Sequence, residues 1–180
     1  MTSASEINLS RYLEKGDTVV AVAPDAACID ALGKVDDITV LIAEPAPGND
    51  AGEVVFPDPS GPFTGTLDRS ADDIPRHIRL LHIGRNASAY DILRGATNML
   101  RRARIDLVHV SGDEGLRHRS AIVAFLACVG YQSIPSADHE DAPTESTEVT
   151  EESIFAVHER LLPGMSGTWP ESAEDRLSRY

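Results

Sequence analysis

Three polar residues, His82, Arg85 and Asn86, lie close together at the end of an apolar segment. A guanidinium pairs well with a phosphate or a carboxylate, so this group could contact an anionic ligand. Short polar side chains also cap helices, and Asn86 or Ser88 could cap a helix that follows. Both interpretations stay open, and the sequence favours the cap.

A second group of possible ligands follows the next apolar segment. His109, Asp113, Glu114 and His118 all carry atoms that can coordinate a metal ion. Their spacing matches no compact zinc pattern, and neither cysteine is near them in the sequence. We therefore predict no metal site.

Arginines gather in the segment from residue 94 to residue 119. Such a run of charge usually forms a solvated helix face. It could also bind an acidic partner or the acidic tail of the same chain. The side chains that we expect to contact a ligand or partner are Arg85, Asn86, Arg101 and Arg102.

Two cysteines, Cys28 and Cys128, both lie in apolar stretches. Two buried free thiols fit this pattern better than a disulfide, which predicts a reducing compartment. The sequence indicates no histidine that would pair with Cys28, so we interpret Cys28 as a structural thiol rather than a nucleophile.

The stretch from residue 78 to residue 110 has the pattern of a strand, a turn, an amphipathic helix and a second strand. The helical face is formed by residues at three- and four-residue spacings, namely Ile92, Leu93, Ala96, Met99, Leu100 and Ala103. A strand–helix–strand unit of this length is a right-handed crossover, so its strands should be parallel.

The remaining pattern alternates short apolar segments with helical ones. It predicts strands over 18–22, 38–43, 53–56 and 131–134, helices over 25–32, 120–129 and 151–162, and a loop over 57–65. This alternation indicates an α/β fold with a mostly parallel sheet and helices on both faces. Ligands bind such sheets beyond the carboxyl ends of the strands. Those positions are 23–27, 44–47, 82–88 and 111–115.

Length and charge bound the organisation of the chain. Its 180 residues suit one domain, which we place at 1–136, followed by an acidic linker at 137–150 and a C-terminal helix and extended tail at 151–180.

The net charge of the chain is −13, of which 137–180 contribute −8, from 3 basic and 11 acidic residues. This balance argues against binding to nucleic acid. Without a signal sequence or a long apolar run, we expect a cytoplasmic protein with no membrane insertion.

Several short motifs occur in an order that is typical of one family. They are LEKGDTVV at 13–20, IAEP at 42–45, GEVVF at 52–56, LHI at 81–83 and DILRGA at 91–96. Together they resemble the FkbM-type methyltransferases, which use S-adenosylmethionine, over roughly residues 9–134. The resemblance implies a Rossmann-like sheet of the methyltransferase type. It also places Glu44 at the acidic residue that holds the cofactor ribose in that family.

The sequence departs from the family pattern at the glycines of the cofactor loop and at the acidic residues of both motifs. A cofactor loop needs glycines so that the backbone can approach the ligand, but the segment AVAPDAAC at 21–28 contains none. Alanines take the acidic position and the two glycine positions of that loop, at Ala21, Ala23 and Ala27. In the second motif the family's Asp, Glu, Gly and second Glu are replaced by Gly84, Asn86, Ala87 and Ala89.

These losses favour a catalytically degenerate methyltransferase-like domain that acts as a binding or assembly module. We expect no cofactor, and a protein partner or self-association. A first alternative is a divergent O-methyltransferase acting on a small molecule or glycan. It would bind S-adenosylmethionine through Glu44 and use His82 as general base; a competing register of the motifs makes Asp25 a second cofactor-binding candidate. A second alternative is a structural subunit of a larger assembly.

Overall fold

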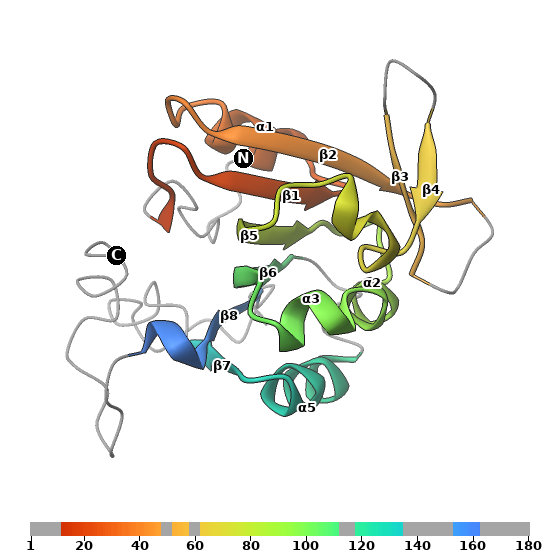
Figure 1. Ribbon diagram of the computed structural model, residues 1–180, viewed down its shortest axis with the longest axis vertical. Coiled ribbons are helices and arrows are strands. Elements are labelled where there is room, and N and C mark those ends of the chain that lie inside the picture. The colour runs from red at the N-terminus through yellow and green to blue at the C-terminus, as the bar shows by residue number, and fades with distance from the viewer. Residues whose placement is uncertain (1–11, 48–51, 58–61, 112–117, 135–152, 163–180) are drawn as a thin grey trace, which may run out of the picture.

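The computed structural model describes residues 12–47, 52–57, 62–111, 118–134 and 153–162. Its strands are β1 (Thr18–Val22), β2 (Thr39–Pro45), β3 (Val54–Phe56), β4 (Phe63–Gly65), β5 (Ile78–Ile83), β6 (Ile105–Val110), β7 (Tyr131–Ile134) and β8 (Ile154–His158). They form one sheet in the order β4-β3-β2-β1-β5-β6-β8-β7 (Figure 1).

The centre of the sheet is parallel. Strands β2, β1, β5 and β6 run in one direction, with Val19 opposite both Val40 and Leu80, and Leu80 opposite Leu107. At one end β3 and β4 add antiparallel pairs, and at the other end β8 runs antiparallel to both β6 and β7. The predicted Rossmann-like α/β fold is therefore confirmed.

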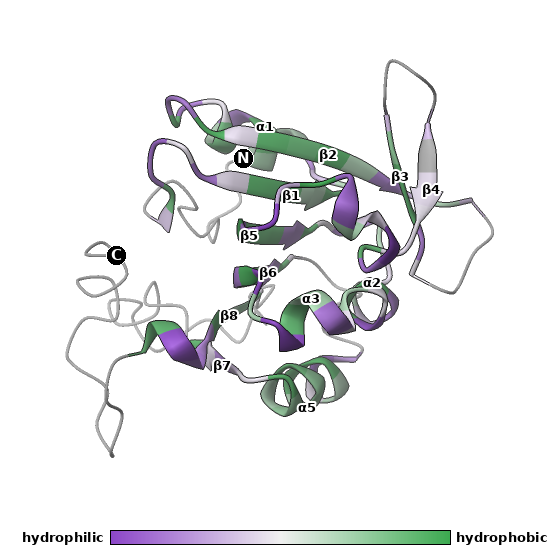
Figure 2. Ribbon diagram, viewed as in Figure 1, coloured by the Kyte–Doolittle hydropathy of each residue, from purple (hydrophilic) through white to green (hydrophobic). Residues whose placement is uncertain are grey.

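Helices cover both faces of the sheet (Figure 1). Helix α1 (Ala26–Leu32) packs its Cys28 and Leu32 with β1, β5 and β6 side chains that include Val19. Helices α2 (Ala89–Gly95), α3 (Thr97–Arg101) and α5 (Arg119–Cys128) bury apolar side chains in a second core that contains Val20 and Leu81. Neighbouring strand positions enter different cores because side chains alternate between the faces of a sheet. The central strands are hydrophobic along most of their length (Figure 2).

The predicted helix after β5 is divided into two. Helix α2 ends at Gly95, and α3 begins at Thr97 after Ala96, whose φ of −108° and ψ of 12° leave the helical region. The Asp68 carboxylate accepts hydrogen bonds from the backbone N–H groups of Asn98 at 2.8 Å and Met99 at 2.9 Å. It satisfies amides that have no partner in the first turn of a helix, which explains why a new helix starts here.

The prediction of a helix over 151–162 is wrong. Residues Ile154–His158 form β8, and only Glu159–Leu161 make a short 3₁₀ turn, η4. All five residues of β8 are buried, since the strand lies inside the sheet with a layer on each face. The sheet therefore extends beyond the predicted boundary at 136. The acidic linker at 137–150 and the tail after 162 lie outside the described residues.

Two smaller predictions also need correction. The predicted loop over 57–65 contains β4, which pairs with β3. Both cysteines are free as predicted, but only Cys28 is buried, whereas Cys128 is exposed on α5. Within the described parts of the chain, no helix combines the length and apolarity that crossing a bilayer requires.

Candidate functional site

The carboxyl ends of β1 and β5 form the switch point of the sheet. The chain leaves β1 toward the α1 face and leaves β5 toward the face covered by α2 and α3 (Figure 1). In open α/β sheets this is where ligands bind. The segments predicted to surround a ligand, 23–27 and 82–88, do meet here.

The backbone of the β1 turn fills the space beside Gly84. The Gly84 N–H donates to the Val22 carbonyl at 2.8 Å, and the Ala23 N–H donates to the Ala43 carbonyl at 2.8 Å. A β-carbon placed on Gly84 would lie 1.9 Å from the Ala23 carbonyl oxygen. Ala23 itself is 6% exposed and has a φ of +46°, a conformation in which glycine is the usual residue. Position 84 therefore has no room for a side chain, and certainly none for a carboxylate.

The two candidate cofactor-binding acids lie at the ends of neighbouring strands. Glu44 is exposed at the end of β2, where it stands opposite Val55 of β3. Asp25 is also exposed, and its carboxylate accepts a hydrogen bond from the Cys28 N–H at 2.8 Å. Asp25 is thus the N-cap of α1, as its position in the sequence predicted.

The turn after β5 carries the polar residues that were considered for anion binding. Arg85 and Asn86 are exposed in this turn. Ser88 occupies the N-cap position of α2, although its hydroxyl donates to the Asp91 carboxylate at 2.6 Å rather than accepting from an amide. Ser88 therefore stands at the predicted cap position but makes no capping hydrogen bond to the helix backbone.

His82 lies inside the protein, where it contacts His109. The two residues are register partners on β5 and β6, are 2% and 6% exposed, and bring their Nδ1 atoms within 2.9 Å. Such a contact requires one ring to donate and the other to accept. Among the described residues no hydrogen-bond partner reaches either Nε2 atom.

Burial controls the protonation of this histidine pair. It lowers the pKa of His82 to about 4, although the nearby Asp25 charge acts in the opposite direction. It lowers the pKa of His109 to about 3, with a further contribution from His82. Both rings are neutral at pH 7, and His82 is a weak base that solvent barely reaches.

A charged cluster lies at the opposite, amino end of β6. The buried Asp106 carboxylate accepts hydrogen bonds from Arg79 at 3.2 Å and from the Arg160 guanidinium, and it lies 2.9 Å from His77 Nε2. Burial alone raises the pKa of Asp106, but the hydrogen bonds from His77, Arg160 and Arg79 outweigh it and the pKa is lowered. Because Arg160 lies two residues after β8, this cluster connects the end of β8 to β6.

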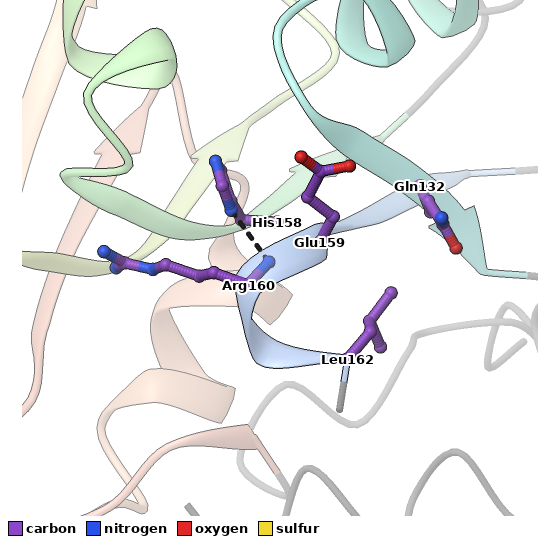
Figure 3. A pocket seen from close by; sticks show the side chains of 5 residues that line it. All are labelled: Gln132, His158, Glu159, Arg160 and Leu162. Atoms are coloured by element: carbon purple, nitrogen blue, oxygen red, sulfur yellow. Dashed lines mark hydrogen bonds between the residues drawn. The ribbon is translucent and has the colours of Figure 1, made fainter. Parts of the chain in front are cut away.

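A pocket of about 320 Å³ lies beside the same cluster. Its walls come from β7, β8 and the residues after β8 (Figure 3), namely Gln132, His158, Glu159, Arg160 and Leu162. The Arg160 N–H donates to His158 Nδ1 at 3.1 Å, and the Arg160 guanidinium is held by Asp106. This pocket is at the end of the sheet opposite to the switch point, so it is not the predicted ligand site.

The remaining candidates are dispersed. Among the described residues, no three His, Cys, Asp or Glu side chains come together as metal ligands. His109 pairs with His82, His118 lies 6.5 Å from the Tyr90 ring, and positions 113 and 114 are outside the described ranges. Arg101 and Arg102 are exposed at the end of α3.

Two side-chain clusters were not predicted from the sequence. One is the histidine pair, which has a readable signal, since His82 and His109 are each the fifth residue of a buried strand in one parallel unit. The other is the Asp106 cluster. Arg79 and Asp106 carry the same kind of signal, since each is the second residue of its strand in that parallel unit. Arg160 carries none, because only the position of β8 brings it to them.

Comparisons with known proteins give weak likenesses. No protein-family model and no curated protein matches the chain. Among solved structures, a methyltransferase from Pyrococcus furiosus is 11% identical with a TM-score of 0.33, covering 83% of this chain and 82% of that one. An aspartate aminotransferase from Thermus thermophilus with maleate is 14% identical with a TM-score of 0.31, covering 68% of this chain and 41% of that one. The functional conclusion rests on the residues at the carboxyl ends of the strands.

Proposed function

We propose that this chain is a methyltransferase-like domain that has lost its cofactor site and acts by binding another protein or by assembly. The observation that carries the proposal is the contact between Gly84 and the backbone of Ala23. In the FkbM-type pattern that the sequence resembles, position 84 is an acidic residue. Here a carbonyl group occupies the space that its β-carbon would need.

The turn after β1 supports the same conclusion. A methyltransferase brings the methionine part of its cofactor close to backbone atoms, which requires glycines in this turn. This chain has alanine at both positions, and Ala23 packs against the turn of β5 instead. Asp25, the second candidate, already caps α1 through its carboxylate. We expect no cofactor, and we place the protein in the reducing cytoplasm.

One observation favours the alternative of a divergent O-methyltransferase. Glu44 is exposed at the end of β2, the position at which an acidic residue would hold a ribose. That enzyme would also need a general base, and His82 is buried against His109 with its pKa lowered to about 4. The balance of residues therefore favours the binding module.

Isothermal titration of the full chain with S-adenosylmethionine tests the proposal. We expect no binding heat up to roughly millimolar cofactor, whereas a micromolar dissociation constant would overturn the proposal. If heat is seen, Glu44→Ala should abolish it and Asp72→Ala, another exposed acid far from the switch point, should not. That pattern would establish the methyltransferase alternative.

Light scattering addresses the remaining alternative of a structural subunit. A monomer mass that is independent of concentration fits a module that binds a different protein. A stable closed oligomer would instead assign the chain a structural role in an assembly of its own copies.

A further inference from the structure

One side of β2 has little cover from the described chain. Leu41 and Ala43 face the core beneath α2, and Val40 packs on the other side, with the core that contains α1. Strand side chains alternate, so Ile42 lies on the same side as Val40. Ile42 is 37% exposed, although its register partner Ala21 on β1 is fully buried.

The exposure has a topological cause. After β2 the chain does not cross back over the sheet but turns into antiparallel β3, with Glu44 opposite Val55 and the Ala46 N–H donating to the Glu53 carbonyl at 2.9 Å. A crossover to a parallel strand would have placed a helix on this side.

Helix α1 is too short to replace that helix. Its seven residues bury Cys28 and Leu32, and Ile29 on the flank of this buried stripe is 45% exposed. Ile29 and Ile42 are the exposed large hydrophobic residues of the described chain. We call Ile29, Val40 and Ile42 the apolar strip; β2 is the hydrophobic upper edge of the parallel strands in Figure 2.

Acidic side chains lie on the same elements as the apolar strip. The exposed acids Asp25, Asp30, Asp36 and Glu44 come from the ends of α1 and β2 and from the turn between them, and we call them the acidic rim. Residues 25–45 contain five acids and one basic residue, Lys34, a net charge of −4. A second copy of this chain would bring a net charge of −13 to this surface and be repelled.

We propose that the apolar strip and the acidic rim bind an amphipathic helix of a partner protein, with lysine or arginine flanking its apolar face. This inference rests on the proposed function as a binding module and names the chemistry of the partner. Such a helix would take the place of the missing crossover, with its apolar face on the strip and its cations against the rim. The seven residues of β2 span about 23 Å, which a helix of about 15 residues matches.

Nuclear magnetic resonance of the ¹⁵N-labelled full chain tests the site. The probe is a synthetic helix of about 16 residues with leucines at three- and four-residue spacings and lysines beside them. The control peptide keeps the leucines and carries glutamates instead. We expect the lysine peptide to shift the resonances of 26–32 and 39–44 with a dissociation constant of tens of micromolar, about the affinity of a small interface, and the glutamate peptide to cause no shifts.

Three pairs of substitutions separate local contacts from overall charge. Ile29→Ser with Ile42→Ser should weaken binding at least about tenfold, because it removes apolar contact without changing charge. Asp30→Asn with Glu44→Gln should weaken it roughly threefold to tenfold. Asp72→Asn with Asp73→Asn makes the same charge change in exposed residues of a different segment, and it should leave the affinity within about twofold.

Several results would overturn this assignment. Shifts confined to the acidic segment 137–150, equal effects of the two charge-removing pairs, or no binding of the lysine peptide would each do so. Self-association that Ile29→Ser with Ile42→Ser abolishes would make a second copy the occupant of the strip. None of these results affects the proposed loss of the cofactor site, which fails only if S-adenosylmethionine binds.

Discussion

The contact between Gly84 and Ala23 determines which side chains the switch point can hold. Neither residue carries a functional group, yet the carbonyl of one fills the space beside the α-carbon of the other. A single added methyl group must therefore displace backbone atoms. This residue-level feature separates the present chain from a family in which that position is acidic.

Replacing Gly84 with alanine should destabilise the protein. The new β-carbon would lie 1.9 Å from the Ala23 carbonyl oxygen, so the turn after β1 must move. Overpacking of this kind costs about 2 kcal/mol or more of unfolding free energy, which urea denaturation measures. Gly33→Ala is the control, because its β-carbon would meet its nearest neighbour, the Ile29 carbonyl oxygen, at 3.3 Å and should cost far less. Equal losses for both variants would contradict the tight contact.

The His82–His109 pair should make the stability sensitive to acid. The pKa values of about 4 and about 3 in the folded protein lie below the ordinary 6.5, so the unfolded chain binds more protons between these limits. The free energy of unfolding should therefore fall as the pH drops below 6.5, by up to about 1.4 kcal/mol per pH unit for each histidine. Thermal unfolding between pH 7 and pH 4.5 measures this loss.

A matched pair of variants isolates the contribution of the two histidines. His82→Leu with His109→Leu should flatten the pH dependence, because neither position can then take up a proton on unfolding. His118→Gln changes an exposed histidine and should keep the wild-type slope. If the double variant loses stability with acid as steeply as the wild type, the histidine pair is not the source.

At the scale of elements, Asp68 explains why one predicted helix is two. Its carboxylate accepts from the amides of Asn98 and Met99, which start α3. Asp68→Ala should cost about 1–2 kcal/mol, the usual loss for removing a helix cap, in urea unfolding experiments. Asp73→Ala, a nearby exposed acid, should be within about 0.5 kcal/mol of the wild type. Equal stabilities of the two variants would show that Asp68 does not act as a cap.

The elements that could be predicted are those with a local signal. The β5–α2/α3–β6 unit follows from apolar periodicity, and α1 follows from Asp25 at its cap. Strand β8 was mistaken for a helix because Ile154, Phe155, Val157 and Leu161 also satisfy helical spacing, and only pairing with both β6 and β7 decides between the two. The apolar strip could not be predicted either, since it depends on the lack of a crossover helix over β2 in the described structure.

For the candidate site, the residue types could be predicted from the sequence but their packing could not. The absence of glycines and acids in its turns is visible in the sequence, and so are the positions of Glu44 and Asp25. The closure at Gly84 is not visible, because it depends on where the Ala23 carbonyl lies in three dimensions. Whether a departure from a motif leaves an open site or a filled one is a question of packing.

For the molecule as a whole, the sheet should open from its ends rather than from its centre. Strands β5 and β6 are buried at every position, whereas β3 has two half-buried residues of three and β7 has exposed residues in its middle. Native-state hydrogen exchange should therefore find the slowest amides in β1, β5 and β6 and faster ones in β3 and β7. Uniform exchange rates across the sheet would contradict this gradient.

The place of β8 sets a late step in the folding of the chain. It is the last strand of the described residues, yet it lies between β6 and β7 and pairs with both. During synthesis β6 therefore remains an edge with unpaired backbone groups until the ribosome has released residue 158, and β7 has no strand to pair with. A chain that stops earlier would present that apolar edge to other chains, which is a route to aggregation. The number of residues between β7 and β8 therefore sets how long the β6 edge stays exposed during synthesis.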